Sequence, residues 1–337
     1  MMKYLIIVIG LLFVGCNSGQ NQWVRNQSVG AALGTSYTII YIANASVDYQ
    51  KEIDSVFNAV NQSLSTYIPS SDISKINKGD STVVVDHMFK EVFQLSKTIY
   101  DNTNGYFDPT VGTLVNAWGF GPGEEITMDS TSVDSLLAFV GFEKVALSND
   151  NRVKKEDARI YFDFNAIAKG YAIDRVAVML SNKGITDFLI EVGGELVAKG
   201  INKTKGKPWL VGIDDPESTT TRGSKILLNL QDKALASSGN YRKFRIDEQT
   251  GEKYVHTVDP KTGYTKNSVT LGVNIIANNC ATADAYATAF MAMDLEDAFK
   301  LIAKNRALEA YVIYLDETGE TQEFLTNGFK ELVVQQN

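Results

Sequence analysis

The sequence predicts an α+β fold with mixed or antiparallel sheets and packed helices. Segments rich in β-branched and aromatic residues are interspersed with amphipathic segments of helical spacing along the chain. Tight-turn sequences such as Gly193-Gly194 directly join neighbouring strand-like segments, which is typical of hairpins. Hairpins mixed with helices favour an α+β architecture over a Rossmann fold.

The expected helices carry apolar residues at three- and four-residue spacing. Ile53, Phe57, Val60 and Leu64 form such a stripe in the first of them. Ser70-Ser71-Asp72 offers a cap for a short helix that follows. We expect longer helices at residues 48–65, 87–102, 132–140, about 165–182 and 295–305, and one that begins within 278–289.

The expected strands are short and rich in Val, Ile, Tyr and Phe. The segments at 226–230 and 234–237 lie close together in sequence, so we expect them to pair as an antiparallel hairpin. The strands are expected at residues 36–42, 143–148, 159–164, 188–192, 196–198, 209–213, 226–230, 234–237, 269–277, 310–315 and 321–325.

The chain begins with a segment that resembles the leader of a bacterial lipoprotein. After a basic start, residues 4–14 are apolar over signal-peptide length and are too short to span a bilayer. The run ends Leu12-Phe13-Val14-Gly15-Cys16, which is similar to a lipobox. An ordinary signal peptide with an incidental cysteine is the alternative.

This leader predicts the domain organisation and the location of the protein. We expect a signal peptide at residues 1–15 and a lipidated Cys16 with a flexible tether at residues 16–30, because Asn, Ser, Gly and Gln are frequent there. Residues 31–337 then form one domain. The lipid would attach it to a bacterial membrane, facing the periplasm or the outside.

Composition excludes several classes of function. The chain has 40 Asp and Glu against 32 Lys and Arg, and the absence of a basic run argues against nucleic acid as a partner. His87 and His256 are the only histidines, which are too few for a histidine-based metal cluster. Cys280 is expected to be a small buried residue, because nothing nearby in sequence activates it.

Asp284 and Thr288 are the first candidate site residues. They lie four residues apart in a segment that reads as a helix, so they share one face. A carboxylate and a hydroxyl side by side are hard oxygen ligands that suit Mg²⁺. The alternative is an alanine-rich core helix with an internally satisfied Asp and a Thr bonded to its own backbone.

Lys169 is a second candidate, in the first turn of a helix that follows a strand-like segment. A helix N-terminus offers free N–H groups and partial positive charge, so Lys169 there predicts an anion site. The sequence is neither a P-loop nor GxGxxG. A surface lysine is the alternative.

Aromatic residues among glycines, as in Trp118-Gly119-Phe120, can form a flat wall for a planar ligand or pack in a core at a turn. We expect Glu195 to stabilise the Gly193-Gly194 turn that precedes it.

Five segments in this order resemble the FAD:protein FMN transferase family, also called ApbE. The resemblance covers residues 31–327. Its most specific parts are Asp163 to Gly170 with Tyr171, Gly193-Gly194-Glu195, Ser237-Ser238-Gly239-Asn240-Tyr241, His256-Thr257-Val258-Asp259-Pro260 with Gly263, and Ala283-Asp284-Ala285 with Thr288.

The resemblance implies a single two-lobed catalytic unit and a reaction. Members of the family cleave FAD, transfer its FMN part to a Thr hydroxyl of an acceptor protein through a phosphoester bond, and release AMP with Mg²⁺ present. The expected partners are therefore FAD, as substrate, and an acceptor flavoprotein subunit that carries the modified Thr. An Mg²⁺-dependent FAD pyrophosphatase and a non-catalytic FAD-binding lipoprotein remain alternatives.

The resemblance also implies roles for individual residues. Asp284, Thr288 and the backbone carbonyl of Ala166 would bind Mg²⁺. Ala287 stands where some members have an acid, and Leu33 stands where Met is usual. The implied catalytic residues are Asp284, Lys169 and His256, and the implied FAD-binding residues are Leu33, Tyr67, Trp118, Gly119, Phe120, Asp163, Lys169 and Val258.

Overall fold

The fold is described from a computed structural model of the chain. It describes residues 23–214, 224–239, 244–246, 253–266 and 268–334. The expected signal peptide, Cys16, and the segment Asn240-Tyr241 lie outside these residues.

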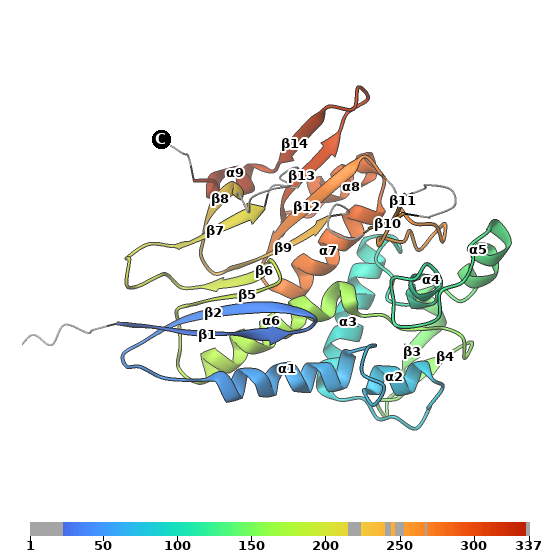
Figure 1. Cartoon of the computed structure of the whole chain (residues 1–337), viewed down its shortest axis with the longest axis horizontal. Coiled ribbons are helices and arrows are strands. Elements are labelled where there is room, and N and C mark those ends of the chain that lie inside the picture. The colour runs from blue at the N-terminus through green and yellow to red at the C-terminus, as the bar shows by residue number, and fades with distance from the viewer. Residues whose placement is uncertain (1–22, 215–223, 240–243, 247–252, 267, 335–337) are drawn as a thin grey trace, which may run out of the picture.

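The centre of the fold is an eight-stranded sheet (Figure 1). Each strand pairs antiparallel with its neighbours, which confirms the predicted class of sheet. The strands, in sheet order, are β1 (Val24–Ala32), β2 (Thr35–Ala43), β5 (Phe188–Val192), β6 (Glu195–Lys199), β9 (Lys233–Gly239), β12 (Thr270–Ala277), β13 (Glu309–Leu315) and β14 (Thr321–Leu325).

Helices cover one face of this sheet and bury the largest core. In the described part of the chain, α6 packs against β5 and β6, while α7 packs against β9 and β12. Fully buried aromatic residues such as Phe89, Phe162 and Phe290 fill the space between sheet and helices. The helices of this layer are α1 (Gln50–Leu64), α2 (Asp72–Asn77), α3 (His87–Asn102), α6 (Asn165–Asn182), α7 (Cys280–Ala292) and α8 (Leu295–Lys304).

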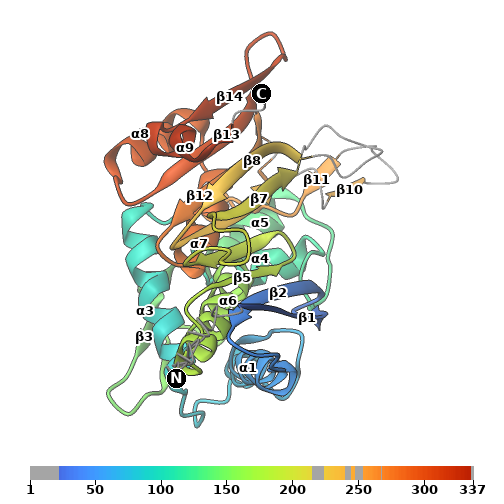
Figure 2. The same ribbon diagram turned by 90° about the vertical axis from the view of Figure 1, so that its left-hand side faces the viewer.

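A hairpin and a short helix cover the other face. Strands β7 (Trp209–Asp214) and β8 (Ser224–Leu230) pair with each other, and α9 (Asn327–Leu332) packs on β8 and β13. Trp209, Leu228 and Phe329 bury a second core there. Figure 2 shows α9 beside β13 and β14, with α1 at the opposite end of the molecule near β1 and β2.

The predicted pairing of the segments at 226–230 and 234–237 is wrong. Strand β8 pairs with β7, whereas β9 enters the main sheet between β6 and β12. The chain turns at Asp232, which has a φ of 52°, and its carboxylate accepts a hydrogen bond from Gly200 N. This turn carries the chain from the second layer into the sheet instead of closing a hairpin.

A smaller lobe, residues 103–163, lies beyond α3 at the right of Figure 1. It contains α4 (Gly112–Ala117), α5 (Ser130–Leu137), a 3₁₀ turn (Phe142–Lys144) and the paired strands β3 (Val145–Leu147) and β4 (Val153–Lys155). Leu114, Val140 and Val258 form a separate small core at this lobe.

The strand predicted at 159–164 is wrong. Tyr161 makes a single bridge with Val111. The Phe162 backbone N–H donates to Asn77 Oδ1, and the Asp163 N–H donates to Pro109 O. The backbone of this segment is therefore satisfied by loops and side chains, not by a neighbouring strand.

The tether predicted at residues 16–30 is wrong from Val24 onward. Strand β1 pairs with β2 along its whole length, from Val24 opposite Ala43 to Ala32 opposite Thr35. Asn26 and Ser28 are its buried residues, and Asn26 bonds to Ala45 O and to Val47 N. A polar segment joins the sheet because these bonds satisfy its buried side chain.

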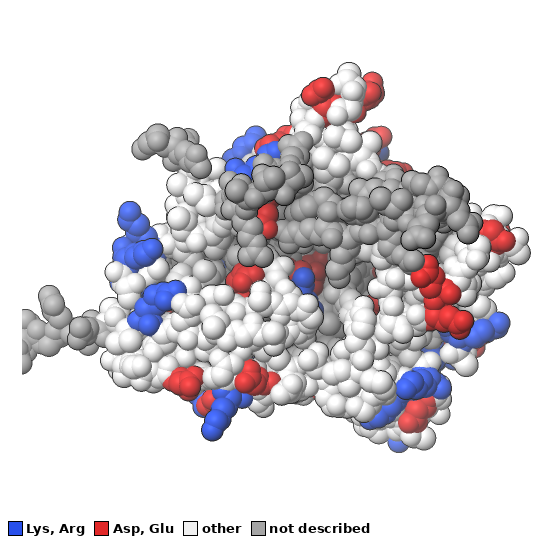
Figure 3. Space-filling model, in the orientation of Figure 1, with Lys and Arg blue, Asp and Glu red and all other residues white. Residues whose placement is uncertain are grey.

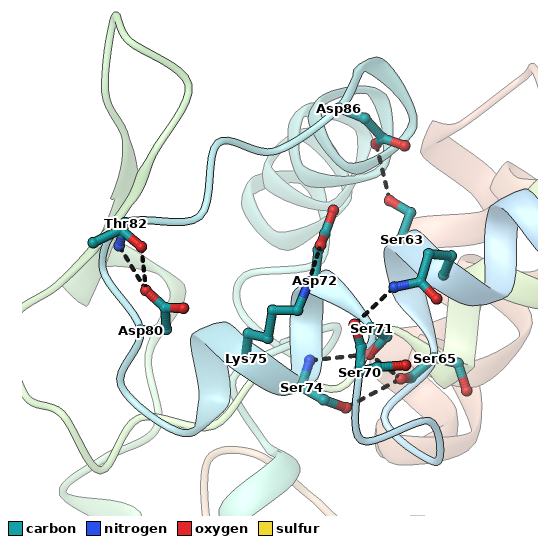
Figure 4. A network of polar contacts seen from close by, with 11 residues as sticks. Ser63, Ser65, Ser70, Ser71, Asp72, Ser74, Lys75, Asp80, Thr82 and Asp86 are labelled. Carbon is teal, nitrogen blue, oxygen red and sulfur yellow. Dashed lines mark hydrogen bonds and ion pairs between the residues drawn. The ribbon is translucent and has the colours of Figure 1, made fainter.

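A serine-rich hydrogen-bond network fixes the loop between α1 and α2 (Figure 4). Of the predicted cap segment Ser70-Ser71-Asp72, it is Ser71 that caps α2 by accepting from Ser74 N, and its hydroxyl donates to Ser65 O at 2.6 Å. The Ser74 hydroxyl also reaches Ser65 O. The loop that carries Tyr67 is held at both ends by these bonds.

Charges of both signs are scattered over the face shown in Figure 3. Among the described residues, no helix combines the length and the hydropathy that crossing a membrane requires.

Strands β10 (Phe244–Ile246) and β11 (Lys253–Val255) pair antiparallel in a small two-stranded sheet that precedes the segment containing His256.

Candidate active site

The N-terminus of α7 is held in place by two side chains. Asn279 is the N-cap, and its Oδ1 accepts from Thr282 N at 2.8 Å. Asp174 of α6 accepts from Cys280 N at 2.8 Å and from Ala281 N at 2.9 Å. Burial raises the pKa of Asp174 to about 6. These bonds satisfy N–H groups that a helix leaves open at its start and fix α7 to α6.

Helices α6 and α7 approach closely at Gly170. A Cβ atom at this position would lie 2.4 Å from Cys280 O, so only glycine fits. The Gly170 N–H donates to Asp284 Oδ2 at 3.1 Å. Cys280 is fully buried at the same contact, as predicted, and burial raises its pKa well above the usual thiol value.

Lys169, Glu195 and Asp284 form a charged cluster at this contact, in which the two carboxyl side chains are buried and the lysine is partly exposed. Lys169 Nζ lies 2.9 Å from Glu195 Oε1, while Glu195 and Asp284 are 3% and 4% exposed. Glu195 Oε2 is buried and has no hydrogen-bond partner. One ammonium therefore faces two carboxylates in a site with little water.

The pKa values of the cluster follow from burial and mutual charge. Burial, with the charge of Asp284 adding to it, raises the pKa of Glu195 to about 8. Burial also raises the pKa of Asp284. Burial alone would lower the pKa of Lys169, but the charges of Glu195 and Asp284 raise it.

The residues around Asp284 fit a hard divalent cation. Thr288 lies one turn further along α7, and its Oγ1 is 3.5 Å from Ser238 Oγ of β9. Ala166 lies one turn before Gly170 in α6. Carboxylate, hydroxyl and carbonyl oxygens are the donors that Mg²⁺ prefers. Within the described residues no group of three His, Cys, Asp or Glu side chains is placed to bind a metal, so the donor set does not fit zinc.

Tyr67, in the loop between α1 and α2, lies close to Asp163. Tyr67 is 59% exposed, and partial burial together with the charge of Asp163 raises its pKa. Loss of hydration raises the pKa of Asp163, although its Oδ1 accepts from Asn165 N at 2.7 Å. An exposed ring beside a carboxylate can hold a planar, polar ligand.

Trp118 and Val258 belong to a second group of contacts. Trp118 Nε1 donates to Gly263 O at 2.9 Å, and its ring centroid lies 6.4 Å from that of Tyr264. Gly119 has a φ of 76°, and Phe120 follows it with its side chain partly exposed. Val258 is buried against Leu114 and Val140.

Leu33 and His256 lie at element ends. Leu33 has a φ of 54° at the turn between β1 and β2, a conformation that costs a non-glycine residue about 1–2 kcal/mol. Thr35, two residues further on, lies against Gly193. A Cβ atom added to Gly193 would lie 2.7 Å from Thr35 Cγ2. His256 follows β11 directly and is partly exposed.

The structure thus brings Lys169, Asp284 and Thr288 to the contact of α6, α7 and the sheet, with Ala166 in the same turn of α6. The groups around Tyr67 and Trp118 are separate sets of contacts. Sequence reasoning missed that Glu195 belongs to the charged cluster, although Gly193-Gly194-Glu195 was noted as a motif, and it missed that Asp174 holds the start of α7. The turn-stabilising role predicted for Glu195 is filled by Glu191, whose Oε1 accepts from Gly194 N at 2.6 Å.

An antiparallel α+β fold that places two buried carboxyl groups and a threonine hydroxyl beside a partly exposed lysine defines a protein whose site has the oxygen donors that suit a hard cation. The chain belongs to the ApbE family, whose family model matches residues 33–312.

Curated relatives and solved structures agree with this membership. A FAD:protein FMN transferase from Vibrio cholerae is 33% identical over 95% of this chain and 95% of its own length. One from Haemophilus influenzae is 30% identical over 90% of each chain. The structure of flavin transferase ApbE from Vibrio cholerae superposes with a TM-score of 0.82 at 30% identity, covering 92% of this chain and 99% of that one.

Proposed function

We propose that this protein is an FAD:protein FMN transferase. It takes FAD as substrate and transfers the FMN part to a Thr hydroxyl of an acceptor flavoprotein, with Mg²⁺ as the cation. Family membership supports the reaction class. The observation that carries the mechanism is the buried Asp284 carboxylate, held by Gly170 N and one turn from Thr288.

The proposed reaction exchanges one phosphorus–oxygen bond for another. The Thr oxygen bonds to the phosphorus of the FMN half, and the bond from that phosphorus to the bridging oxygen breaks. AMP leaves with the bridging oxygen and its electron pair, and the Thr proton is released. Negative charge accumulates on the phosphoryl oxygens and on AMP, so catalysis requires positive charge placed nearby.

The residues of the cluster supply or hold that positive charge. Bound Mg²⁺, held by Asp284, Thr288 and the carbonyl of Ala166, would neutralise phosphoryl charge. Lys169 directs an ammonium toward the same region from the first turn of α6. In this proposal Tyr67 and Trp118 contact the ring systems of FAD, as the resemblance to the family implies.

The acidic cluster and the partly exposed Lys169 also support a hydrolytic outcome, in which water replaces the Thr hydroxyl. The test therefore uses a form of the protein that begins at Asn17, mixed with FAD, Mg²⁺ and a candidate acceptor. The acceptor's intact mass and released AMP are both measured. Transfer predicts a mass gain of one FMN together with Mg²⁺-dependent AMP.

Asp284→Asn is the matched variant for this test. Loss of the charged ligand is expected to lower the rate of AMP release by at least about 100-fold, a typical effect of removing one group that stabilises transition-state charge. AMP with free FMN and an unmodified acceptor would indicate hydrolysis. Bound FAD without any AMP would contradict the enzymatic function.

We also propose that Cys16 is lipidated and attaches the domain to a membrane, facing the periplasm or the outside. The support is the leader sequence that ends at Cys16. In cells given radiolabelled palmitate, the wild-type protein is expected to carry label that the Cys16→Ala variant lacks. Equal labelling of both proteins would contradict the proposal.

A further inference from the structure

Lys169 has two buried carboxylates near it but pairs with one. In the part of the chain that the structure describes, its Nζ lies 2.9 Å from Glu195 Oε1. The charge of Asp284 also acts on Lys169, more weakly than that of Glu195. Glu195 enters the site from the first position of β6, whereas Asp284 enters from α7.

The choice of partner matters for the chemistry of Asp284. An ammonium paired with a buried carboxylate neutralises it, and the low polarity of the site makes such a pair strong. A lysine bonded to Asp284 would therefore compete with a divalent cation for the same oxygens. Glu195 gives the ammonium an alternative carboxyl partner.

The burial of Glu195 is explained if it serves as the partner of the Lys169 ammonium. Its side chain is 5% exposed, Oε1 is used by Lys169, and Oε2 has no hydrogen-bond partner. Burying a carboxylate is costly unless it is paired, and the Gly193-Gly194 turn does not need it, because Glu191 serves that turn.

We propose that Glu195 is a positioning residue that holds the Lys169 ammonium away from Asp284 and so keeps the Asp284 carboxylate available to a divalent cation. This inference rests on the cation site of the proposed function. It assigns Glu195 no direct contact with the cation.

The test is a double-mutant cycle on cation binding, with Mn²⁺ alone as the probe. Free Mn²⁺ is measured by electron paramagnetic resonance, and Mg²⁺ binding is measured by calorimetry. The proteins are the wild type, Glu195→Gln, Lys169→Met and the double variant. Glu191→Gln is the matched control, because Glu191 lies in the same turn and its described contact is with Gly194 N.

Glu195→Gln is expected to weaken Mn²⁺ binding by at least about 10-fold, the lower end of effects for residues that support metal ligands, because Lys169 moves to Asp284. Adding Lys169→Met removes the competing ammonium and is expected to restore the affinity to within about 3-fold of the wild type. Glu191→Gln is expected to bind as the wild type does.

Two results would overturn the inference. Unchanged affinity in Glu195→Gln would show that Glu195 does not control Asp284. Weak binding in the double variant would show that Glu195 ligates the cation itself. If Glu195→Gln is unfolded by circular dichroism, the double variant, in which Asp284 is the one charged side chain left of the three, still separates these roles. A wild-type protein that binds no Mn²⁺ contradicts the cation site of the proposed function instead.

Discussion

Asp108 is a buried carboxylate outside the candidate site, and it joins two segments of the smaller lobe. Its Oδ1 accepts from the backbone and the hydroxyl of Thr110, and its Oδ2 accepts from Phe142 N. Burial outweighs these bonds and raises the pKa of Asp108 to about 6. The charged form is therefore less favourable in the folded protein than in the unfolded chain.

This shift predicts how stability changes with pH. The folded state binds a proton at Asp108 more tightly than the unfolded state does, so the contribution of Asp108 is most favourable below about pH 4 and is lost as pH rises through about 6. Relative to Asp108→Asn, the wild type is expected to lose up to about 3 kcal/mol of unfolding free energy between pH 4 and 7. Urea unfolding of both proteins at several pH values measures the difference, and a constant difference would contradict the prediction.

Residues whose role depends on spacing within one element could be predicted from the sequence. Asp284 and Thr288 are predictable as a pair of ligands because they lie four positions apart, one turn of a helix, and the structure places both in α7. Glu195 could not be assigned in this way. Its contact with Lys169 joins β6 to α6 across 26 positions of the chain, and only the folding of the sheet onto the helix brings the two charges together.

The contact between α6 and α7 is the element on which the site depends. Gly170 permits the approach, Asp174 bonds to the start of α7, and Asp284 bonds back to Gly170 N. Three polar contacts within little more than one turn of α6 fix the angle and the depth at which α7 lies.

Gly170→Ala tests this contact. In an exposed helix the change would stabilise the protein by up to about 1 kcal/mol. Here the added Cβ would meet Cys280 O, so the expected result is a loss of about 1–3 kcal/mol in unfolding free energy, with weaker Mn²⁺ binding as Asp284 moves. Val178→Ala, on the exposed side of the same helix, is the control and is expected to change neither quantity appreciably. A Gly170→Ala protein of unchanged stability would contradict the close approach.

Elements with regular apolar spacing were predicted well, and elements defined by distant partners were not. Helix α3 and strand β5 have the predicted limits. The pairing of β8 was wrong, because neighbouring segments in sequence were assigned to each other while the apolar face of β8 packs with β7 over the second core. A local pattern gives the type of an element but does not select its partner.

At the scale of the whole molecule, strand β1 makes the N-terminal segment part of the folded domain. The strand was missed because its inward positions carry Asn26 and Ser28, so the alternation of apolar and polar residues that marks a strand is absent. The bonds of Asn26 to Ala45 O and Val47 N connect it to the segment that leads into α1.

Shortened forms of the protein test this assignment. A form that begins at Trp23 is expected to unfold at the same urea concentration as the form that begins at Asn17. A form that begins at Leu33 loses β1 and the bonds of Asn26, and its unfolding free energy is expected to fall by more than about 2 kcal/mol. Equal midpoints for all three would show that β1 is dispensable.

The position of β1 also limits how far the domain extends from a lipid anchor. Since the strand starts at Val24, seven residues separate it from Cys16. Seven residues span at most about 25 Å when fully extended. If Cys16 carries lipid, this short connection keeps the catalytic domain near the membrane. An acceptor must then present its Thr close to the membrane surface.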